Sequence, residues 1–76
     1  MIKFKCLSRN SSKIIYSFLW LSIEDGTIEV DTNTTKCTLL TCPDWMNEQD
    51  KEKILYISSK YLKEYHYPDS YIYATH

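Results

Sequence analysis

The side chains able to do covalent chemistry are few in this sequence and lie far apart. They are three cysteines and two histidines: Cys6, Cys37, Cys42, His66 and His76. A thiol just before a helix can act as a nucleophile, and Cys42 has that position in the predicted structure. A nucleophile also needs a base within hydrogen-bond reach, and no histidine accompanies Cys42 in sequence. His66 falls at the end of the predicted helix, where a cation suits the last carbonyls, so we expect no catalytic residues and no enzymatic activity.

The spacing of acids and cysteines does not match a metal site. Cys37 and Cys42 form a C-x4-C pair with no histidine nearby, which is a poor zinc signal. Glu48, Asp50 and Glu52 follow no DxDxDG pattern and are typical of the solvated first turn of a helix. We therefore expect no metal and no cofactor.

The length and composition indicate one small globular domain over residues 1–76. With 43% hydrophobic and 25% charged residues, the chain is too apolar for a disordered segment. A domain of this size buries only about 60% of the surface of its unfolded chain, so its core needs large side chains. Seven tyrosines, two tryptophans and two phenylalanines supply them.

The pattern of apolar residues and cysteines favours a cytoplasmic protein. Residues 1–7 alternate instead of forming a signal peptide, and the longest mostly apolar run, residues 14–23, is too short to span a bilayer. An odd number of cysteines with no paired spacing is typical of a reducing compartment. We expect no association with a membrane.

Alternating residues predict strands in the first half of the chain. The segment IKFKCLS places Ile2 and Phe4 on one side and two lysines on the other, as in an edge strand with a charged outer face. Farther along, EDGT predicts a two-residue type I′ turn at Asp25-Gly26. The register of this hairpin would give one face an aliphatic set suited to packing on a helix: Leu19, Leu21, Ile23, Ile28 and Val30.

The second face of this hairpin raises the main functional question. It carries aromatic side chains on the first strand and acids opposite them on the second: Tyr16, Phe18, Trp20, Glu29 and Asp31. The chain's own residues 37–41 or 71–76, a second copy in a homodimer, or a partner protein could each cover this aromatic strip. Buried aromatic side chains carry much of the binding energy of interfaces, so we expect these five residues to bind a partner.

From residue 44 the apolar residues follow the period of a helix. Acids come early and lysines later, the order that the helix dipole favours, and Thr41 or Asp44 is expected to cap the start. One stripe of the helix is formed by Ile54, Leu55, Ser58, Tyr61, Leu62 and Tyr65. With short strands near residues 37–41 and 71–75, the sequence predicts an α+β domain. It is a small twisted antiparallel sheet of four or five strands with one C-terminal-half helix packed on one face, in the order βββ(β)αβ.

The charged residues are distributed unevenly, although the formal net charge is only −1. Residues 1–13 carry lysine and arginine and no acid, whereas acids predominate between residues 24 and 50. An acidic surface is expected from Glu24, Asp25, Asp44, Glu48 and Asp50. Such a surface could occupy the basic groove of a nucleic-acid-binding protein in place of phosphates.

These features predict a small non-enzymatic protein-binding module. Frequent Ile, Lys, Asn and Tyr are expected of an AT-rich genome, and with the small size they favour a phage- or mobile-element-encoded inhibitor of a host protein. An anti-CRISPR-like block of a host defence nuclease complex, steric or charge-based, is one form of this hypothesis. The alternative is a single-stranded nucleic-acid-binding protein whose bases stack on the aromatic strand face. It is less favoured, because Glu29 and Asp31 would repel phosphates.

Overall fold

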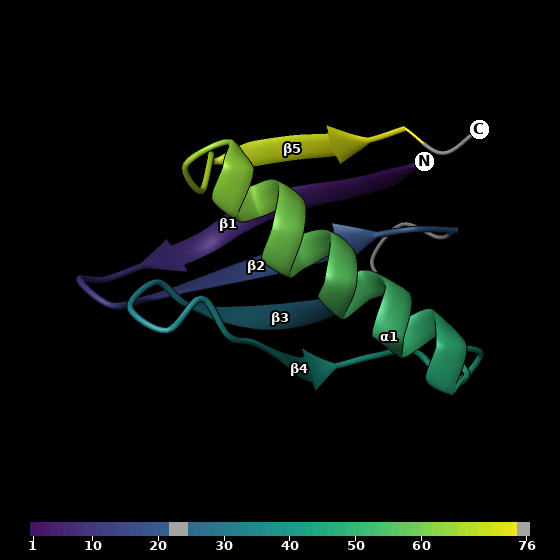
Figure 1. The fold of residues 1–76 in the computed structure, drawn as a ribbon. Helices are drawn as coiled ribbons and strands as arrows, with labels where there is room; N and C mark the ends of the chain where they lie inside the picture. Colours follow the sequence, from purple (N-terminus) through teal and green to yellow (C-terminus); the bar gives the residue numbers. More distant parts are fainter. Residues whose placement is uncertain (22–24, 75–76) are drawn as a thin grey trace.

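The computed structural model describes residues 1–21 and 25–74, which form a five-stranded antiparallel sheet with one helix across one face (Figure 1). The strands are β1 (Ile2–Arg9), β2 (Lys13–Leu19), β3 (Gly26–Asp31), β4 (Cys37–Thr41) and β5 (Ser70–Tyr73). They lie side by side in the order β4-β3-β2-β1-β5. The helix follows β4 and crosses the sheet obliquely (Figure 1). The predicted α+β class is confirmed, and the order of elements is ββββαβ.

The first strand does not lie at an edge of the sheet, so that part of the prediction is wrong. β1 pairs with β2 on one side and with β5 on the other. Its alternation is confirmed, because Ile2 and Phe4 are buried while Lys3 and Lys5 are exposed. A charged outer face fits an inner strand here because only one face of the sheet is covered by a helix.

The register predicted for β2 and β3 is also wrong. Ile28 pairs with Tyr16 and not with Ile23, a slip of seven residues along the first strand. An odd slip exchanges the two faces of a strand, because side chains alternate with a period of two. Tyr16 and Phe18 therefore point toward the helix and are fully buried.

The residues predicted to form the aliphatic face divide accordingly. Ile28 and Val30 are buried under the helix, as expected, but Leu19 is only half-buried on the other face and Leu21 is exposed. Ile23 lies outside the described residues. The error comes from the turn: Gly26 is the first residue of β3, opposite Phe18, and it does not have a positive φ.

β2 ends at Leu19 and β3 begins at Gly26, so the connection is longer than a two-residue turn, and Asp25 stabilises it. Its carboxylate accepts hydrogen bonds from the backbone N–H groups of Trp20 and Leu21, and its own N–H donates to the Phe18 carbonyl at 3.2 Å. Aspartate commonly binds backbone amides in this way in turns. The signal at Asp25-Gly26 thus marks the end of a wider connection, because the side chain of Asp25 replaces the backbone hydrogen bonds of a tight hairpin.

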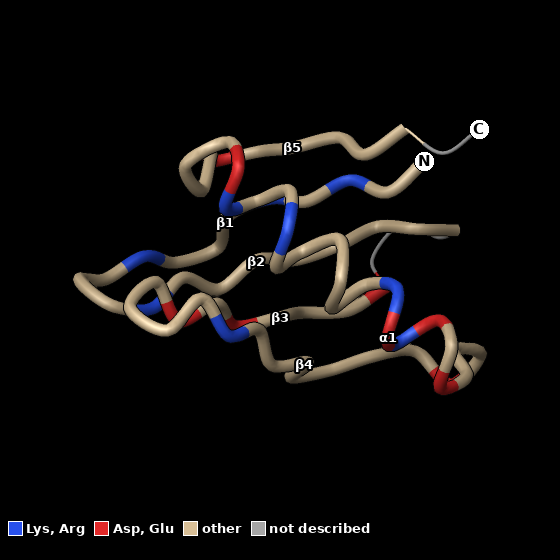
Figure 2. Tube along the Cα trace, in the orientation of Figure 1, with Lys and Arg blue, Asp and Glu red and all other residues tan. Residues whose placement is uncertain are grey.

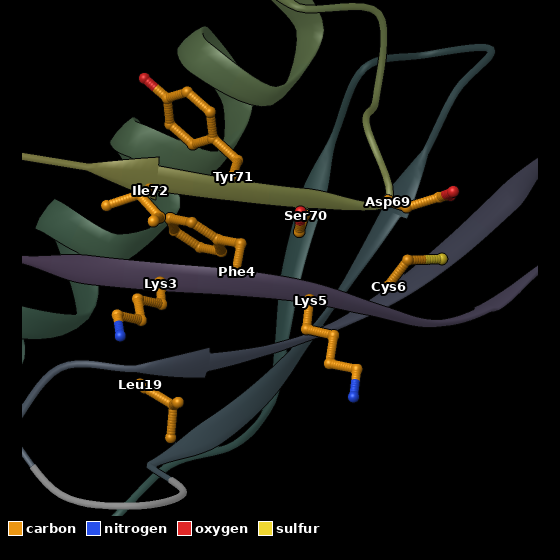
Figure 3. Close-up of a pocket in the computed structure, with 9 residues that line it drawn as sticks. All are labelled: Lys3, Phe4, Lys5, Cys6, Leu19, Asp69, Ser70, Tyr71 and Ile72. Atoms are coloured by element: carbon orange, nitrogen blue, oxygen red, sulfur yellow. The ribbon is translucent and has the colours of Figure 1, made fainter.

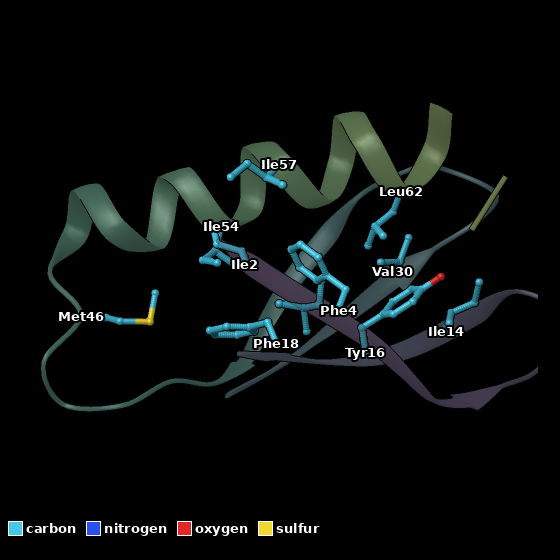
Figure 4. Packing of buried hydrophobic residues seen from close by; sticks show 11 residues of the cluster. Ile2, Phe4, Ile14, Tyr16, Phe18, Val30, Met46, Ile54, Ile57 and Leu62 are labelled. Carbon is cyan, nitrogen blue, oxygen red and sulfur yellow. The ribbon is translucent and has the colours of Figure 1, made fainter. Parts of the chain in front are cut away.

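The hydrophobic core lies between the helix and the covered face of the sheet (Figure 4). Among the described residues it contains eleven buried side chains, from the first three strands, the helix and the segment before it: Ile2, Phe4, Ile14, Tyr16, Phe18, Ile28, Val30, Met46, Ile54, Ile57 and Leu62. The radius of gyration is 11.3 Å, which is the value expected of a compact chain of this length. No helix in the described part of the chain is long and apolar enough to cross a membrane.

The helix has two parts with different geometry. α1 (Glu48–Ile57) begins with a capping box, in which the Asn47 side chain accepts the Asp50 N–H at 2.9 Å and the Asp50 carboxylate accepts the Asn47 N–H at 3.1 Å. The predicted caps Thr41 and Asp44 are therefore wrong, because the reciprocal pair lies farther along. A π turn, η1 (Ser58–Leu62), continues the helix.

The end of the helix turns the chain back toward β5. His66 and Tyr67 both have left-handed backbone conformations, with φ of 60° and 53°. The Tyr67 N–H donates to the Leu62 carbonyl at 2.7 Å, which satisfies one of the last free carbonyls of the helix. As a result β5 returns alongside β1, beneath the second half of the helix (Figure 1).

Candidate interaction surface

The predicted aromatic strip does not form an exposed surface. Tyr16 and Phe18 have no exposed area, and the Tyr16 hydroxyl donates to the Pro68 carbonyl at 2.7 Å. Trp20 is half-buried and packs edge-to-face on Trp45 at 5.7 Å between ring centroids. The chain itself covers the strip, which was one of the alternatives. The covering element, however, is the helix and not residues 37–41 or 71–76.

The two acids predicted to line the strip lie away from it and have local structural roles. Glu29 is opposite Ile15 in the ladder and forms an ion pair with Lys13 at 3.6 Å. The Asp31 carboxylate accepts N–H groups of the β3–β4 turn, from Asn33 at 2.9 Å and from Thr34 at 3.2 Å. The seven-residue slip separates both acids from the aromatic side chains.

The predicted acidic surface is likewise dispersed. Asp25 is buried and Asp50 belongs to the capping box, so neither presents a free charge, whereas Asp44 and Glu48 are exposed. Glu24 lies outside the described residues. Figure 2 shows acidic positions at the start of α1, which covers one face of the sheet, and along β3. Since Glu29 of β3 points to the other face, the acids do not form one surface.

Cys42 and His66, which were considered for catalysis, are not brought together, and His76 lies outside the described residues. Cys42 precedes the helix and His66 follows it, so about fifteen helical residues separate them, or about 22 Å at the usual rise. The three cysteines are free and half-buried, and burial raises the pKa of Cys37 to about 11. Within residues 1–21 and 25–74, no three His, Cys, Asp or Glu side chains are grouped so as to hold a metal ion.

The side chains that do gather at the surface are tyrosines from the second half of the helix and from β5. We call them the tyrosine surface: Tyr56, Tyr61, Tyr65, Tyr71 and Tyr73. The Tyr61 ring stacks on Tyr71 with centroids 6.3 Å apart and lies 5.0 Å from Tyr73. The Tyr65 ring lies 5.2 Å from Tyr71. These contacts hold Tyr61, Tyr65, Tyr71 and Tyr73 in fixed positions before any partner binds.

Part of the tyrosine surface is strongly exposed. Tyr56 and Tyr65 are 58% and 54% accessible, while the three rings between the helix and β5 are half-buried. The Lys60 Nζ atom lies over the rings of Tyr56 and Tyr61, at 5.6 and 5.4 Å from their centroids, and donates to the Tyr56 hydroxyl at 3.3 Å. This hydrogen bond raises the pKa of Lys60. The surface therefore combines large apolar area with one fixed cation.

The opposite face of the sheet carries a second feature, a shallow hollow of about 440 Å³ over β5, β1 and β2. Figure 3 shows Lys3, Lys5 and Leu19 pointing away from the helix, whereas Tyr71 points toward it. Ile72 completes the apolar rim and is 57% exposed. Neither lysine forms an ion pair within the described residues. This face is mixed in character, with apolar and cationic side chains interleaved.

The tyrosine surface was not anticipated from the sequence, although its spacing holds a signal. Tyr71 and Tyr73 alternate on one strand, and Tyr61 and Tyr65 lie four residues apart on a helix, so each pair shares one side of its element. A short return from helix to strand brings the two sides together. The sequence pattern had assigned Tyr65 to the core stripe instead, and it is exposed because the π turn alters the helical phase before it.

Comparison with known proteins gives no further indication, since the chain matches no protein-family model, no curated protein and no solved structure.

Proposed function

We propose that this chain is a non-enzymatic protein-binding module that inhibits its partner by covering part of the partner's surface. The tyrosine surface is the observation that carries the proposal. Tyrosine and tryptophan are enriched at the centres of interfaces, where a few of them supply most of the binding energy. Four tyrosines from the helix end and β5 are held by ring contacts at 5.0–6.3 Å, and Tyr56 is tied to them through Lys60, so together they form such a centre.

The arrangement of the rings favours binding with little loss of conformational freedom. A tyrosine has few rotatable bonds, and here each inner ring is already held by at least one other ring. A partner would therefore lose little affinity to side-chain ordering at this surface. Steric blocking follows from this mode of binding, since the module has to cover whatever surface it occupies.

Charge-based blocking has less support than steric blocking. The acids that would replace phosphates are divided between a buried turn, a helix cap and the other face of the sheet. Nucleic-acid binding through the aromatic strand face has less support as well, because Tyr16 and Phe18 have no accessible area on which bases could stack. We therefore assign the partner surface to the second half of the helix and β5.

Affinity capture tests this proposal. The tagged protein is immobilised and exposed to lysate of a bacterial host, with and without nuclease treatment, beside a Tyr56→Ala/Tyr65→Ala variant and a Thr38→Ala control on the exposed side of β4. We expect a stoichiometric protein partner to be retained by the unmodified chain and the control, and to be reduced more than tenfold on the tyrosine variant. The circular dichroism spectrum checks that all three remain folded.

Equal retention of the partner by the tyrosine variant would contradict this assignment. Recovery of nucleic acid alone, lost after nuclease treatment, would overturn the proposal in favour of a nucleic-acid-binding function. Salt separates the two classes independently, because phosphate contacts lose affinity steeply on a log–log plot, whereas an interface held by aromatic side chains does not.

A further inference from the structure

No strand of the described residues pairs with the outer side of β5, whose backbone hydrogen-bonding groups follow a defined pattern. The Cys6 N–H donates to the Asp69 carbonyl at 2.7 Å, and the β1–β5 register places these two residues directly opposite each other. In an antiparallel ladder, opposite pairs alternate between bonded and non-bonded. Tyr71 and Tyr73, two and four residues from Asp69, therefore bond to β1. Ile72, between them, directs its N–H and carbonyl away from β1, to the edge of the sheet.

β5 is short, at four residues, but it lacks the other features that usually prevent pairing with another strand. β5 has the sequence SYIY, with no charge and no proline, and its pairing with β1 contains no bulge. The opposite edge differs, because β4 carries a bulge at Leu40, where the register with β3 shifts. Short strands, charged side chains, prolines and bulges are the common means of protecting an edge strand, and β5 has only the first of them. An unprotected edge is therefore a site where a further strand can add.

We propose that β5 pairs antiparallel with β5 of a second copy of this chain, so that two sheets join into one across a two-fold axis. The inference goes beyond the proposed function and does not rest on it. The seam does use Tyr65, Tyr71 and Tyr73 of the tyrosine surface, so a second copy and a partner would compete for these three rings. The hydrogen-bond pattern selects the register: the axis passes between the two Ile72 residues, which exchange both of their outward bonds. Tyr71 then faces Tyr73 of the second copy, and Ser70 faces Ala74, so the strand is complementary to itself.

The side chains at the seam fit a second copy. On the open face the two exposed Ile72 side chains cover one another. On the helix face, Tyr65, Tyr71 and Tyr73 of each copy form one continuous aromatic layer, because Tyr65 already contacts Tyr71 at 5.2 Å. The pairing would also remove from water the part of these rings that is still exposed, which is largest for Tyr65 at 54%.

Electrostatics also permits the pairing. β5 itself carries no charge, and the nearest exposed cations on its flank, Lys3 and Lys5, lie one strand behind the edge. Three strand spacings, about 14 Å, would separate β1 of one copy from β1 of the other. That distance exceeds the Debye length of about 8 Å at physiological ionic strength, so repulsion between the two pairs of lysines is largely screened.

Proline and cysteine substitutions at Ile72 test the seam. Ile72→Pro removes an N–H that points away from β1, so it leaves the β1–β5 ladder intact while blocking the new one; edge strands tolerate proline in that position. We expect sedimentation equilibrium to show a concentration-dependent dimer for the unmodified chain and for the Ile72→Val control. The dimer dissociation constant of Ile72→Pro should be more than tenfold larger, with an unchanged circular dichroism spectrum.

Cross-linking gives the register directly. Opposite residues of a bonded pair have Cα atoms about 5.5 Å apart, which is the usual span of a disulfide. Mild oxidation should therefore link two copies of Ile72→Cys through position 72, identified by peptide mapping, whereas Ser70→Cys, on the same face of the same strand, should not link. A monomeric unmodified chain up to its solubility limit, or a dimer unaffected by Ile72→Pro, would overturn the proposal. Tyr56→Ala should leave the dimer unchanged, which separates this result from the test of partner binding.

Discussion

Gly26 lies opposite Phe18 in the β2–β3 ladder, and the Phe18 ring occupies the space that a side chain at position 26 would need. A Cβ atom at Gly26 would lie 2.7 Å from the Phe18 Cζ atom and would also meet the Thr41 carbonyl of β4. The glycine is thus required by close packing between three strands and not by a positive φ.

Replacing this glycine should therefore destabilise the fold. We expect Gly26→Ala to lower the free energy of unfolding in urea by about 1–3 kcal/mol, the usual cost of overpacking. The upper part of that range is expected, because a backbone carbonyl cannot move as a flexible side chain does. Thr38→Ala, on the exposed side of the neighbouring strand, should stay within about 0.5 kcal/mol of the unmodified chain. A Gly26→Ala chain as stable as this control would show that the strands separate at low cost.

Asp25 should be a residue of stability rather than of partner recognition. Its carboxylate binds the N–H groups of Trp20 and Leu21, and its removal leaves both donors without that acceptor. Asp25→Ala should cost about 1–3 kcal/mol in denaturant unfolding. Asp44→Ala, which removes an exposed acid of the same charge, should change stability little. Similar effects for the two variants would contradict this role of Asp25.

The stability of the protein should fall at alkaline pH. Burial raises the pKa of Tyr16 from 10.0 to about 12 and that of Cys37 from 9.0 to about 11. Between the ordinary and the raised pKa, the folded chain keeps a proton that the unfolded chain has lost. The free energy of unfolding therefore decreases with rising pH, from about pH 9 for Cys37 and from about pH 10 for Tyr16.

Urea unfolding at a series of pH values measures this loss. Tyr16→Phe should be less stable at neutral pH by about 0.5–1.5 kcal/mol, because its hydrogen bond to the Pro68 carbonyl is lost. Its stability should nevertheless decline less steeply than that of the unmodified chain between pH 10 and 12. Parallel declines would mean that Tyr16 is accessible to water in the folded state.

A single substitution in the β3–β4 turn should raise stability. Thr35 has a φ of 61°, which is unfavourable for a β-branched residue, and its hydroxyl donates a hydrogen bond to the neighbouring carbonyl of Thr34. The left-handed conformation costs roughly 1–2 kcal/mol, and glycine removes that cost while adding chain entropy to the unfolded state. We expect Thr35→Gly to gain about 0.5–1 kcal/mol in thermal unfolding. Thr34→Gly, without a positive φ to relieve, should lose stability.

The sequence predicted the class of fold because the relevant signals were periodic. The change from alternation to helical period was correct although the helix begins at Glu48, four residues after the predicted change, and the burial of Ile54 and Leu62 was correct as well. The hairpin failed because Asp25-Gly26 has two readings that a local pattern cannot separate. A tight turn and a close strand contact both favour glycine, and only the position of Thr41 and Phe18 distinguishes them.

The predicted aromatic strip depended on the register of that hairpin, so the error in the register made the predicted site wrong as well. A slip of an even number of residues would have kept Tyr16 and Phe18 on the predicted face, but seven residues placed both in the core. The tyrosine surface could not be located in advance because it requires β5 to lie beside β1, a pairing between opposite ends of the chain. The many tyrosines are residues typical of an interface, but which of them lie together depends on the pairing of β5 with β1.

The strand order also has a consequence for how the chain folds. β1, β2, β3 and β4 are joined by short connections, whereas β5 pairs with β1 across almost the whole sequence, as Ile2 and Tyr73 show. Contacts between distant residues carry a larger entropic cost of loop closure, so they form late unless other contacts shorten the loop. The helix provides that shortening, because its last turn delivers residues 68–70 to the side of β1. Docking of the helix should therefore precede and direct the closure of the sheet, and helix variants should slow folding more than variants of β5.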